Sequence, residues 1–199
     1  MQQLELNNII NHKLDNWQIN IKPCEGENPR EFCNIGRLFL PDHCRYASNE
    51  SELDFDDFTT GNLQKDIKKL DKMGFFALPV SVYDHSGVKV YIGGPCDRWD
   101  SGVIGFYLID KKEVKKDYGW KRINKKHLEE LANAELEEYT AYYNGQVYYY
   151  ELTRNDEELD ACGGFYGLDC FKYMFDNMPQ EFTQLFTLKE AESLATWEY

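Results

Sequence analysis

Two short turns carry the side chains that are best suited to chemistry. They are Asp84-His85-Ser86-Gly87 and Trp99-Asp100-Ser101-Gly102, and apolar, strand-forming runs flank both of them. His85 could act as a general base. The groups that could orient it or serve as its nucleophile are Asp84, Asp97, Asp100, Ser86, Ser101 and Cys96. The same residue types suit tight turns, because Asp and Ser side chains accept hydrogen bonds from turn amides and Gly adopts positive φ. Catalysis and turn formation both stay open here, and we favour turn formation.

Metal binding is a weaker interpretation of the same region. An oxygen-rich set suited to Mg²⁺ or Mn²⁺ consists of Asp84, His85, Asp97 and Asp100. A set of zinc ligands consists of Cys24, Cys33, His43 and Cys44, but it lacks a CxxC pair and HxxxH spacing. The sequence contains no Walker loop and no GxGxxG, HExxH or GxSxG motif. We therefore expect no metal and no cofactor, and we lean towards a protein that is not an enzyme.

The elements that must position these groups follow from the periodicity of the apolar residues. Residues 75–83 and 88–92 flank the first turn and predict a hairpin, and residues 103–109 predict a buried strand. Pro79 within the first of these strands suggests an edge strand or a bulge. Helical spacing predicts amphipathic helices over 62–73 and 124–143. The capping-box spacing of Asp110 and Glu113 predicts a short basic helix that ends at Gly119.

The two ends of the chain add further strands and helices. Residues 17–22 and 35–40 predict edge strands, each closed by a proline, and residues 50–58 are expected to form an acidic connection. Residues 146–153 and 159–165 predict strands around an Asn155-Asp156 turn. Helices are expected over 168–178 and from Thr187 through Ala195 to Trp197. Hairpins mix with helices without regular alternation, which predicts an α+β fold: a central, mostly antiparallel sheet flanked by amphipathic helices. We expect a single domain over 1–199, with an N-terminal part (1–61), a core (62–167) and a helical C-terminal part (168–199).

The net charge of −13 is unevenly distributed along the chain. Residues 1–61 hold 5 Lys/Arg against 11 Asp/Glu, residues 62–126 hold 14 against 8, and residues 127–199 hold 3 against 16. The three segments therefore carry −6, +6 and −13. Charge of one sign concentrated in this way can steer association with a partner of the opposite sign.

Each of the two charged regions gives a candidate binding surface. In the basic region, aromatic residues alternate with cations that could contact phosphates or bases, namely Lys115, Lys116, Tyr118, Trp120, Lys121 and Arg122. In the acidic region, a helix and the segment after it could place carboxylates at the positions where a nucleic-acid-binding protein binds phosphates. The residues proposed for this contact are Glu130, Glu137, Glu138, Asp156, Glu158 and Tyr149. Ordinary solvated surface is the alternative for both regions.

The first residues of the chain and its cysteines indicate in which cellular compartment the protein lies. The first seven residues contain no basic stretch followed by an apolar one, and no run approaches the length of a membrane span. The six cysteines show no tight disulfide framework. We therefore expect a cytoplasmic protein with reduced thiols and no membrane partner.

Several motifs within residues 75–167 carry a family resemblance. They are Tyr83-Asp84-His85-Ser86-Gly87, Cys96 with Trp99-Asp100-Ser101-Gly102, Gly105-Phe106, Tyr118-Gly119-Trp120-Lys121-Arg122-Ile123 and Gly163-Gly164-Phe165-Tyr166-Gly167. Together they resemble small accessory proteins encoded on phages, plasmids and other mobile elements, chiefly of Gram-positive bacteria. The resemblance brings no established activity, but it implies a role for which inhibition of host restriction or CRISPR defence is a leading possibility. One departure from the family pattern, the longer approach from Cys96 to Trp99, argues against a fixed catalytic position for Cys96.

These observations give three functional hypotheses. The leading one is an anti-CRISPR or anti-restriction inhibitor that binds a host defence protein or nuclease complex as an acidic mimic of nucleic acid. The second is a small metal-assisted nuclease or hydrolase with His85 as base, and with Asp84, Asp100 and Ser101 as its other site residues. The third is a replication accessory protein that binds single-stranded DNA through Tyr118 and Trp120. Direct nucleic-acid binding is not favoured, and a homodimer is left open.

Overall fold

The computed structural model describes residues 15–119 and 124–198, which form two compact units. The terminal unit comprises Met1–Glu27 and Gly145–Tyr199, and the central unit comprises Asn28–Asn144. These boundaries differ from the three parts that the sequence suggested, because the strand near the N-terminus pairs with strands from the last third of the chain. That the whole chain behaves as a single domain stays a prediction.

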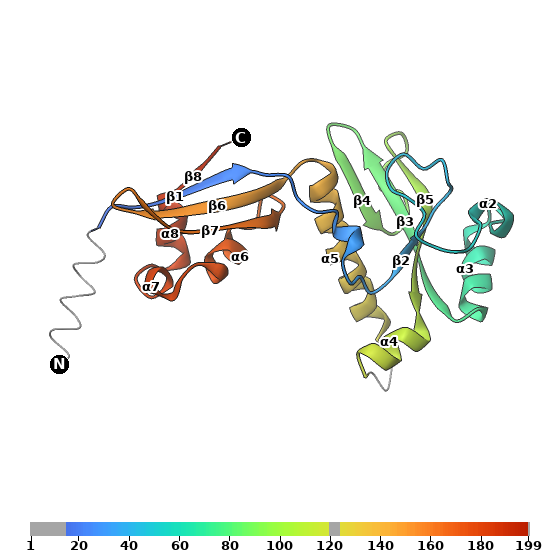
Figure 1. Cartoon of the computed structure of the whole chain (residues 1–199). Helices are drawn as coiled ribbons and strands as arrows, with labels where there is room; N and C mark the ends of the chain where they lie inside the picture. Colours follow the sequence, from blue (N-terminus) through green and yellow to red (C-terminus); the bar gives the residue numbers. More distant parts are fainter. Residues whose placement is uncertain (1–14, 120–123, 199) are drawn as a thin grey trace. The chain divides into compact units, whose positions relative to one another are not determined.

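The central unit is built on an antiparallel sheet with the strand order β2-β5-β3-β4 (Figure 1). The strands are β2 (Arg37–Phe39), β3 (Phe75–Asp84), β4 (Val88–Ile92) and β5 (Ser101–Asp110). The two inner strands, β3 and β5, have nearly continuous apolar sequences, as strands do when both faces of a sheet are covered.

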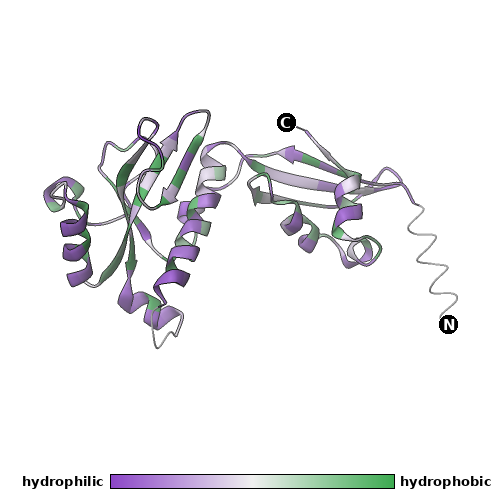
Figure 2. Cartoon of the chain, turned by 180° about the vertical axis from the view of Figure 1, so that it is seen from behind, coloured by the Kyte–Doolittle hydropathy of each residue, from purple (hydrophilic) through white to green (hydrophobic). Residues whose placement is uncertain are grey.

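Helices cover both faces of this sheet. On one face, Leu78 of β3 and Tyr107 of β5 pack against α5 (Lys125–Tyr143). On the other face, the neighbouring residues Ala77 and Phe106 pack with α2 (Phe55–Phe58) and α3 (Leu63–Lys72). Successive side chains of a strand point to opposite faces, so the apolar runs feed two separate cores. Figure 2 shows mostly hydrophilic residues along α3, whose remaining face turns to solvent.

Local signals set the ends of these helices where the sequence predicts them. The side chains of Asn62, Asn124 and Asp110 accept backbone hydrogen bonds at the starts of α3, α5 and α4 (Lys111–Asp117). Gly74 follows α3 with a φ of 103°, which glycine adopts without strain. The helix predictions for this part of the chain are therefore confirmed, and the short α2 was missed because residues 50–58 carry too few apolar residues to show a helical period.

Pro79 lies in an inner strand, so the expectation that it marks an edge strand is wrong. The expectation of a bulge is confirmed, since the pairing of β3 with β5 shifts between Val80 and Ser81. Pairing with β4 starts only at Val80, so the missing N–H of Pro79 interrupts no ladder on that side.

A buried guanidinium ties residues 28–50 to the central sheet. Arg30 follows the start of the 3₁₀ turn η1 (Pro29–Glu31), and its side chain is only 5% exposed. Two of its nitrogens donate to the carboxylate of Glu50 at 2.8 and 2.7 Å, and Nη1 lies 3.3 Å from Oε2 of Glu135 on α5. Hydrogen bonds and charge from Glu50 raise the pKa of Arg30 although burial opposes this. The phenol of Tyr107 also donates to Glu135, and burial together with the charge of Glu135 raises the pKa of Tyr107.

The terminal unit contains the second sheet, with the strand order β7-β6-β1-β8. The strands are β1 (Trp17–Pro23), β6 (Val147–Arg154), β7 (Glu157–Tyr166) and β8 (Ala195–Trp197). Only the short β1–β8 pair is parallel. The helices α6 (Phe171–Asn177), α7 (Gln180–Thr183) and α8 (Leu188–Leu194) pack on one face (Figure 1), around a core that includes Trp17, Ile19, Tyr150 and Phe182.

Two predictions for the terminal unit need correction. Strand β1 is not an edge strand, because β8 pairs with it from the far end of the chain. The last helix begins with the predicted capping box at Thr187 but ends at Leu194. Ala195 and Trp197 belong to β8, and Trp197 packs edge-on against Tyr148 with ring centroids 5.2 Å apart. A sheet pairing between residues 19–21 and 195–197 leaves no trace in the local pattern.

The fold is therefore α+β with mostly antiparallel sheets, as the sequence predicts. Among the residues that the structure describes, no helix has the length and apolar character needed to cross a membrane. All six cysteines are free thiols.

Candidate functional site

The two polar turns lie side by side at one end of the central sheet. Strands β3 and β5 pair in a register that places Tyr83 opposite Ser101, next to both turns. The backbone N–H of Asp84 donates to the carbonyl of Asp100 at 2.8 Å. Nδ1 of His85 lies 3.3 Å from Oδ2 of Asp100, so one of the predicted pairings of His85 with a carboxylate is formed.

The hydrogen bonds within this cluster are those of a turn. Oδ1 of Asp97 accepts from the backbone N–H groups of Trp99 and Asp100 at 2.7 and 2.9 Å, and mainly the bond from Asp100 lowers the pKa of Asp97. The hydroxyl of Ser101 donates to the carbonyl of Asp97 at 2.6 Å, so its proton is not directed at His85. The side chains of His85 and Asp100 are 65% and 39% exposed. These contacts favour the interpretation of the cluster as a structural turn.

The metal-binding alternatives gain no support from the geometry. The guanidinium of Arg45 and the hydroxyl of Tyr46 both contact Oδ2 of Asp84, so that oxygen is already occupied. Of the four zinc candidates, Cys24 belongs to the terminal unit, while Cys33, His43 and Cys44 belong to the central unit. In residues 15–119 and 124–198, no three His, Cys, Asp or Glu side chains are grouped so that they could hold a metal ion.

The basic candidate surface is described only in part. Lys115 and Lys116 are exposed on α4, and Tyr118 directly after this helix is 48% exposed. The other three candidates, Trp120, Lys121 and Arg122, lie outside the described residues. Binding of single-stranded DNA by this segment stays a prediction.

The acidic candidates are divided between the two units. Glu130 and Glu137 are exposed on α5 of the central unit. Glu138 on the same helix is exposed as well, and partial desolvation together with the charge of Glu135 raises its pKa. Glu135 of the same helix faces inward and binds Arg30. Asp156, Glu158 and Tyr149 belong to the terminal unit.

The terminal unit carries most of the negative charge of the molecule. It holds 5 Lys/Arg against 15 Asp/Glu, a net charge of −10, whereas the central unit holds 17 against 20, a net charge of −3. Among the residues of this unit that the structure describes, Lys22 pairs with Glu151 at 2.7 Å, and Arg154 pairs with Asp15 and Glu181 at 2.7 and 2.5 Å. Most of its carboxylates are therefore left for solvent or for a partner.

The acidic hairpin β6–β7 presents the densest group of these carboxylates. Its turn consists of Asn155 and Asp156, with φ values of 52° and 65°, the conformation of a two-residue hairpin turn. Asp156, Glu157 and Glu158 are exposed and form no ion pair with any residue that the structure describes. Asp160 follows, with its Oδ2 accepting from the hydroxyl of Tyr150 at 2.5 Å. Strand β7 is the edge of its sheet, so these acids lie beside backbone groups that have no strand neighbour in the described part of the chain.

Tyr149 lies on the sheet face that α6, α7 and α8 do not cover. Its hydroxyl donates to Oε1 of Glu151 at 3.1 Å, and Glu151 pairs with Lys22. Tyr149 thus belongs to a polar cluster on strand β6 of the acidic hairpin, whereas Glu158 lies on strand β7 next to the turn. Sequence reasoning found the acids of the hairpin but did not see that they lie on an edge strand.

We compared the chain with protein-family models, with curated proteins and with solved structures. No match was found in any of the three comparisons. The resemblance to proteins of mobile elements therefore rests on the sequence motifs alone.

Proposed function

We propose that this chain is a binding protein, not an enzyme, and that its acidic hairpin occupies the nucleic-acid channel of a basic partner protein. The observation that carries the proposal is the net charge of −10 on the terminal unit, with exposed, unpaired carboxylates gathered on the hairpin. Given the motif resemblance, the partner is a host defence protein or nuclease complex of the restriction or CRISPR kind.

The concentration of the charges along the hairpin supports mimicry of a nucleic-acid strand. Asp156 lies in the turn, and Glu157, Glu158 and Asp160 follow it on strand β7, so four carboxylates fall within five residues. This local concentration of negative charge resembles that of a nucleic-acid strand. Long-range attraction to a basic channel would make association fast and sensitive to salt.

A competition experiment tests the proposal. Labelled DNA is bound to a purified nuclease effector, and its displacement by the chain is followed by fluorescence anisotropy at several salt concentrations. Two double variants that change the net charge equally are compared: Glu157→Lys with Glu158→Lys on the hairpin, and Glu130→Lys with Glu137→Lys on α5. Circular dichroism first establishes that both are folded.

We expect the hairpin variant to lose about tenfold or more in apparent affinity, and the α5 variant to lose clearly less. A larger loss in the α5 variant would overturn the assignment to the hairpin. If displacement of DNA is unaffected in both variants, or absent for the unaltered chain with effectors of both kinds, the mimicry proposal fails.

The contact between His85 and Asp100 supports a second candidate function, hydrolysis of a nucleic-acid backbone with His85 as base. The exposure of the cluster and its turn-like hydrogen bonds count against it. Nuclease activity that is lost in His85→Ala and in Asp100→Ala would favour this function. An inhibitory activity that both variants retain, and that needs no divalent ion, would rule it out.

A further inference from the structure

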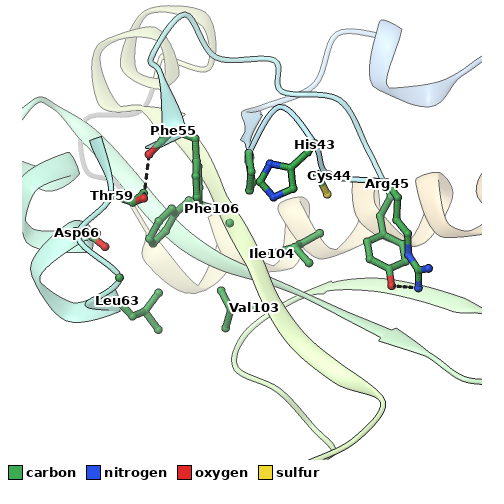
Figure 3. A pocket seen from close by; sticks show the side chains of 14 residues that line it. His43, Cys44, Arg45, Phe55, Thr59, Leu63, Asp66, Val103, Ile104 and Phe106 are labelled. Carbon is green, nitrogen blue, oxygen red and sulfur yellow. Dashed lines mark hydrogen bonds between the residues drawn. The ribbon is translucent and has the colours of Figure 1, made fainter. Parts of the chain in front are cut away.

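The central unit contains a cavity of about 620 Å³ on the sheet face that carries α2 and α3 (Figure 3). It is lined by the loop after β2, by α2 and the turn that follows it, by the first turns of α3, and by residues 103–106 of β5. Sites for small molecules in proteins typically have volumes of about 300–1,000 Å³, mostly apolar walls and few polar groups. This cavity has both features.

Aromatic and aliphatic side chains form most of its wall. The rings of Phe55 and Phe106 lie with centroids 6.4 Å apart and planes tilted by 38°, and Leu63, Val103 and Ile104 complete the apolar surface. Val103 is 41% exposed although it is a large apolar residue on a strand. A molecule bound here would cover apolar surface that the fold leaves open to solvent.

One carboxylate on this wall has an oxygen that is free to accept a hydrogen bond from a ligand. Asp66 of α3 is 2% exposed, and its Oδ1 accepts from the backbone N–H and the hydroxyl of Thr60 at 3.0 and 2.7 Å. Its Oδ2 has no hydrogen-bond partner among the described residues, and no cation of those residues pairs with this carboxylate. Every fully buried side-chain nitrogen or oxygen of the described residues has a hydrogen-bond partner, so Oδ2 faces open space and is not sealed in the core. Figure 3 shows Asp66 among the lining side chains, close to Thr59 and Phe106.

The cations at the other side of the cavity do not supply this partner. Figure 3 shows His43 and Arg45 across the cavity from Asp66. The guanidinium of Arg45 is held by Asp84 and lies over the ring of Tyr46, 4.7 Å from its centroid. Lys69, one turn after Asp66 on α3, donates to the carbonyl of Phe58 at 2.9 Å instead.

We propose that this cavity binds a small organic amine: its ammonium group would donate to Oδ2 of Asp66, and its apolar body would lie between Phe55, Phe106 and Val103. Burial of the apolar body drives binding, and a charge-assisted hydrogen bond to a carboxylate fixes the orientation. Aromatic faces next to the ammonium add cation–π attraction. This site is independent of the acidic hairpin, which belongs to the other unit.

Three probes of similar size test the proposal by ligand-observed NMR and calorimetry on the full chain. They share a phenyl ring on a short alkyl chain and differ in the end group: 2-phenylethylamine, 2-phenylethanol and 3-phenylpropionate. We expect the amine to bind at least about tenfold more tightly than the alcohol, since both can donate a hydrogen bond to the carboxylate but only the ammonium group adds the attraction of opposite charges. The carboxylate should bind most weakly.

Two variants locate the binding. Asp66→Asn keeps the acceptor for Thr60 and should abolish the preference for the amine over the alcohol. Asp71→Asn on the exposed side of the same helix is the matched control and should preserve it. Val103→Trp alters an exposed position and should fill the cavity, so that neither the amine nor the alcohol binds.

Equal affinity for all three probes would overturn the proposal, as would a preference for the amine that persists in Asp66→Asn or binding that survives Val103→Trp. If Asp66→Asn is unfolded, Val103→Trp with Asp71→Asn decides the location of the site.

Discussion

At the residue scale, the buried charge of Arg30 holds several segments of the central unit together. Its guanidinium joins Glu50, the carbonyl of Gly36 and Glu135, which come from three separate parts of the central unit. Glu50 also accepts from the backbone N–H of Leu38 at 2.8 Å, so the same network fixes the start of the edge strand β2. Two of the acids of the central unit, Glu50 and Glu135, are thus used to hold the fold.

We predict that Arg30→Met destabilises the protein by about 3–5 kcal/mol, because it leaves two carboxylates without their buried partner. Arg37→Met, on an exposed position of β2, should change the free energy of unfolding by less than about 0.5 kcal/mol. Urea unfolding followed by circular dichroism measures both. A loss below about 1 kcal/mol in Arg30→Met would mean that the network contributes little to stability.

Asp97 gives a prediction for the pH dependence of stability. The folded protein holds the pKa of Asp97 below its usual value, chiefly through the N–H of Asp100. The charged form therefore contributes stability that is present above the unfolded pKa of about 3.9 and is lost as the pH falls through the lowered pKa.

Asp97→Asn should accordingly be less stable than the unaltered protein at pH 7, and the difference should shrink when urea unfolding is repeated near pH 3. Asp42→Asn, in an exposed loop, serves as the control. A difference that stays constant between the two pH values would contradict a role for the Asp97 charge in the turn.

At the scale of the element, the turn of the hairpin β6–β7 requires positive φ and also carries a negative charge. Asn155 and Asp156 both adopt positive φ, where residues with branched side chains are strained. The same turn presents the first carboxylate of the acidic hairpin. Substitutions at Asp156 can separate the two roles.

We predict that Asp156→Gly keeps or slightly raises stability, because glycine adopts positive φ freely, whereas Asp156→Val costs about 1–2 kcal/mol. Thermal unfolding measures both variants. In the DNA competition experiment, Asp156→Gly should weaken displacement in spite of its intact fold. If it displaces DNA as well as the unaltered chain does, the charge at the turn takes no part in binding.

At the same scale, helix α3 carries an acidic residue, Asp66, on its apolar side. Leu63, Ile67 and Leu70 define the buried side of α3, and Asp66 falls on this side by helical spacing. A carboxylate within an apolar stripe indicates either an internal partner or a ligand. The position of Asp66 within the apolar stripe can be read from the sequence, but the cavity that Asp66 lines cannot.

At the scale of the whole molecule, the two units differ strongly in charge. The terminal unit carries −10 and its hairpin carboxylates repel one another, which destabilises a compact state. We predict that raising NaCl from low to about physiological ionic strength raises the unfolding temperature, since the Debye length then falls to about 8 Å. The double variant Glu157→Gln and Glu158→Gln should respond less to salt. An unfolding temperature that falls with salt would contradict destabilising repulsion among the hairpin carboxylates.

The sequence alone determined most of the elements, because capping residues, turn residues and apolar periods act over a few positions. The helices α3, α4 and α5, the strands β3 to β7, the Asn155-Asp156 turn and the acidic last third of the chain could all be predicted in this way. The proximity of the two polar turns followed from the pairing of the strands beside them.

Only the tertiary structure decided which polar groups are free and which are used. It directed Glu135 inward to Arg30, paired β1 with β8 across the length of the chain, and placed the carboxylate of Asp66 on the wall of a cavity. Each of these contacts joins segments that the local pattern treats as independent, since contact between distant residues is set by how whole elements pack. The tertiary structure also showed that the two polar turns are hydrogen-bonded to each other at one end of a sheet.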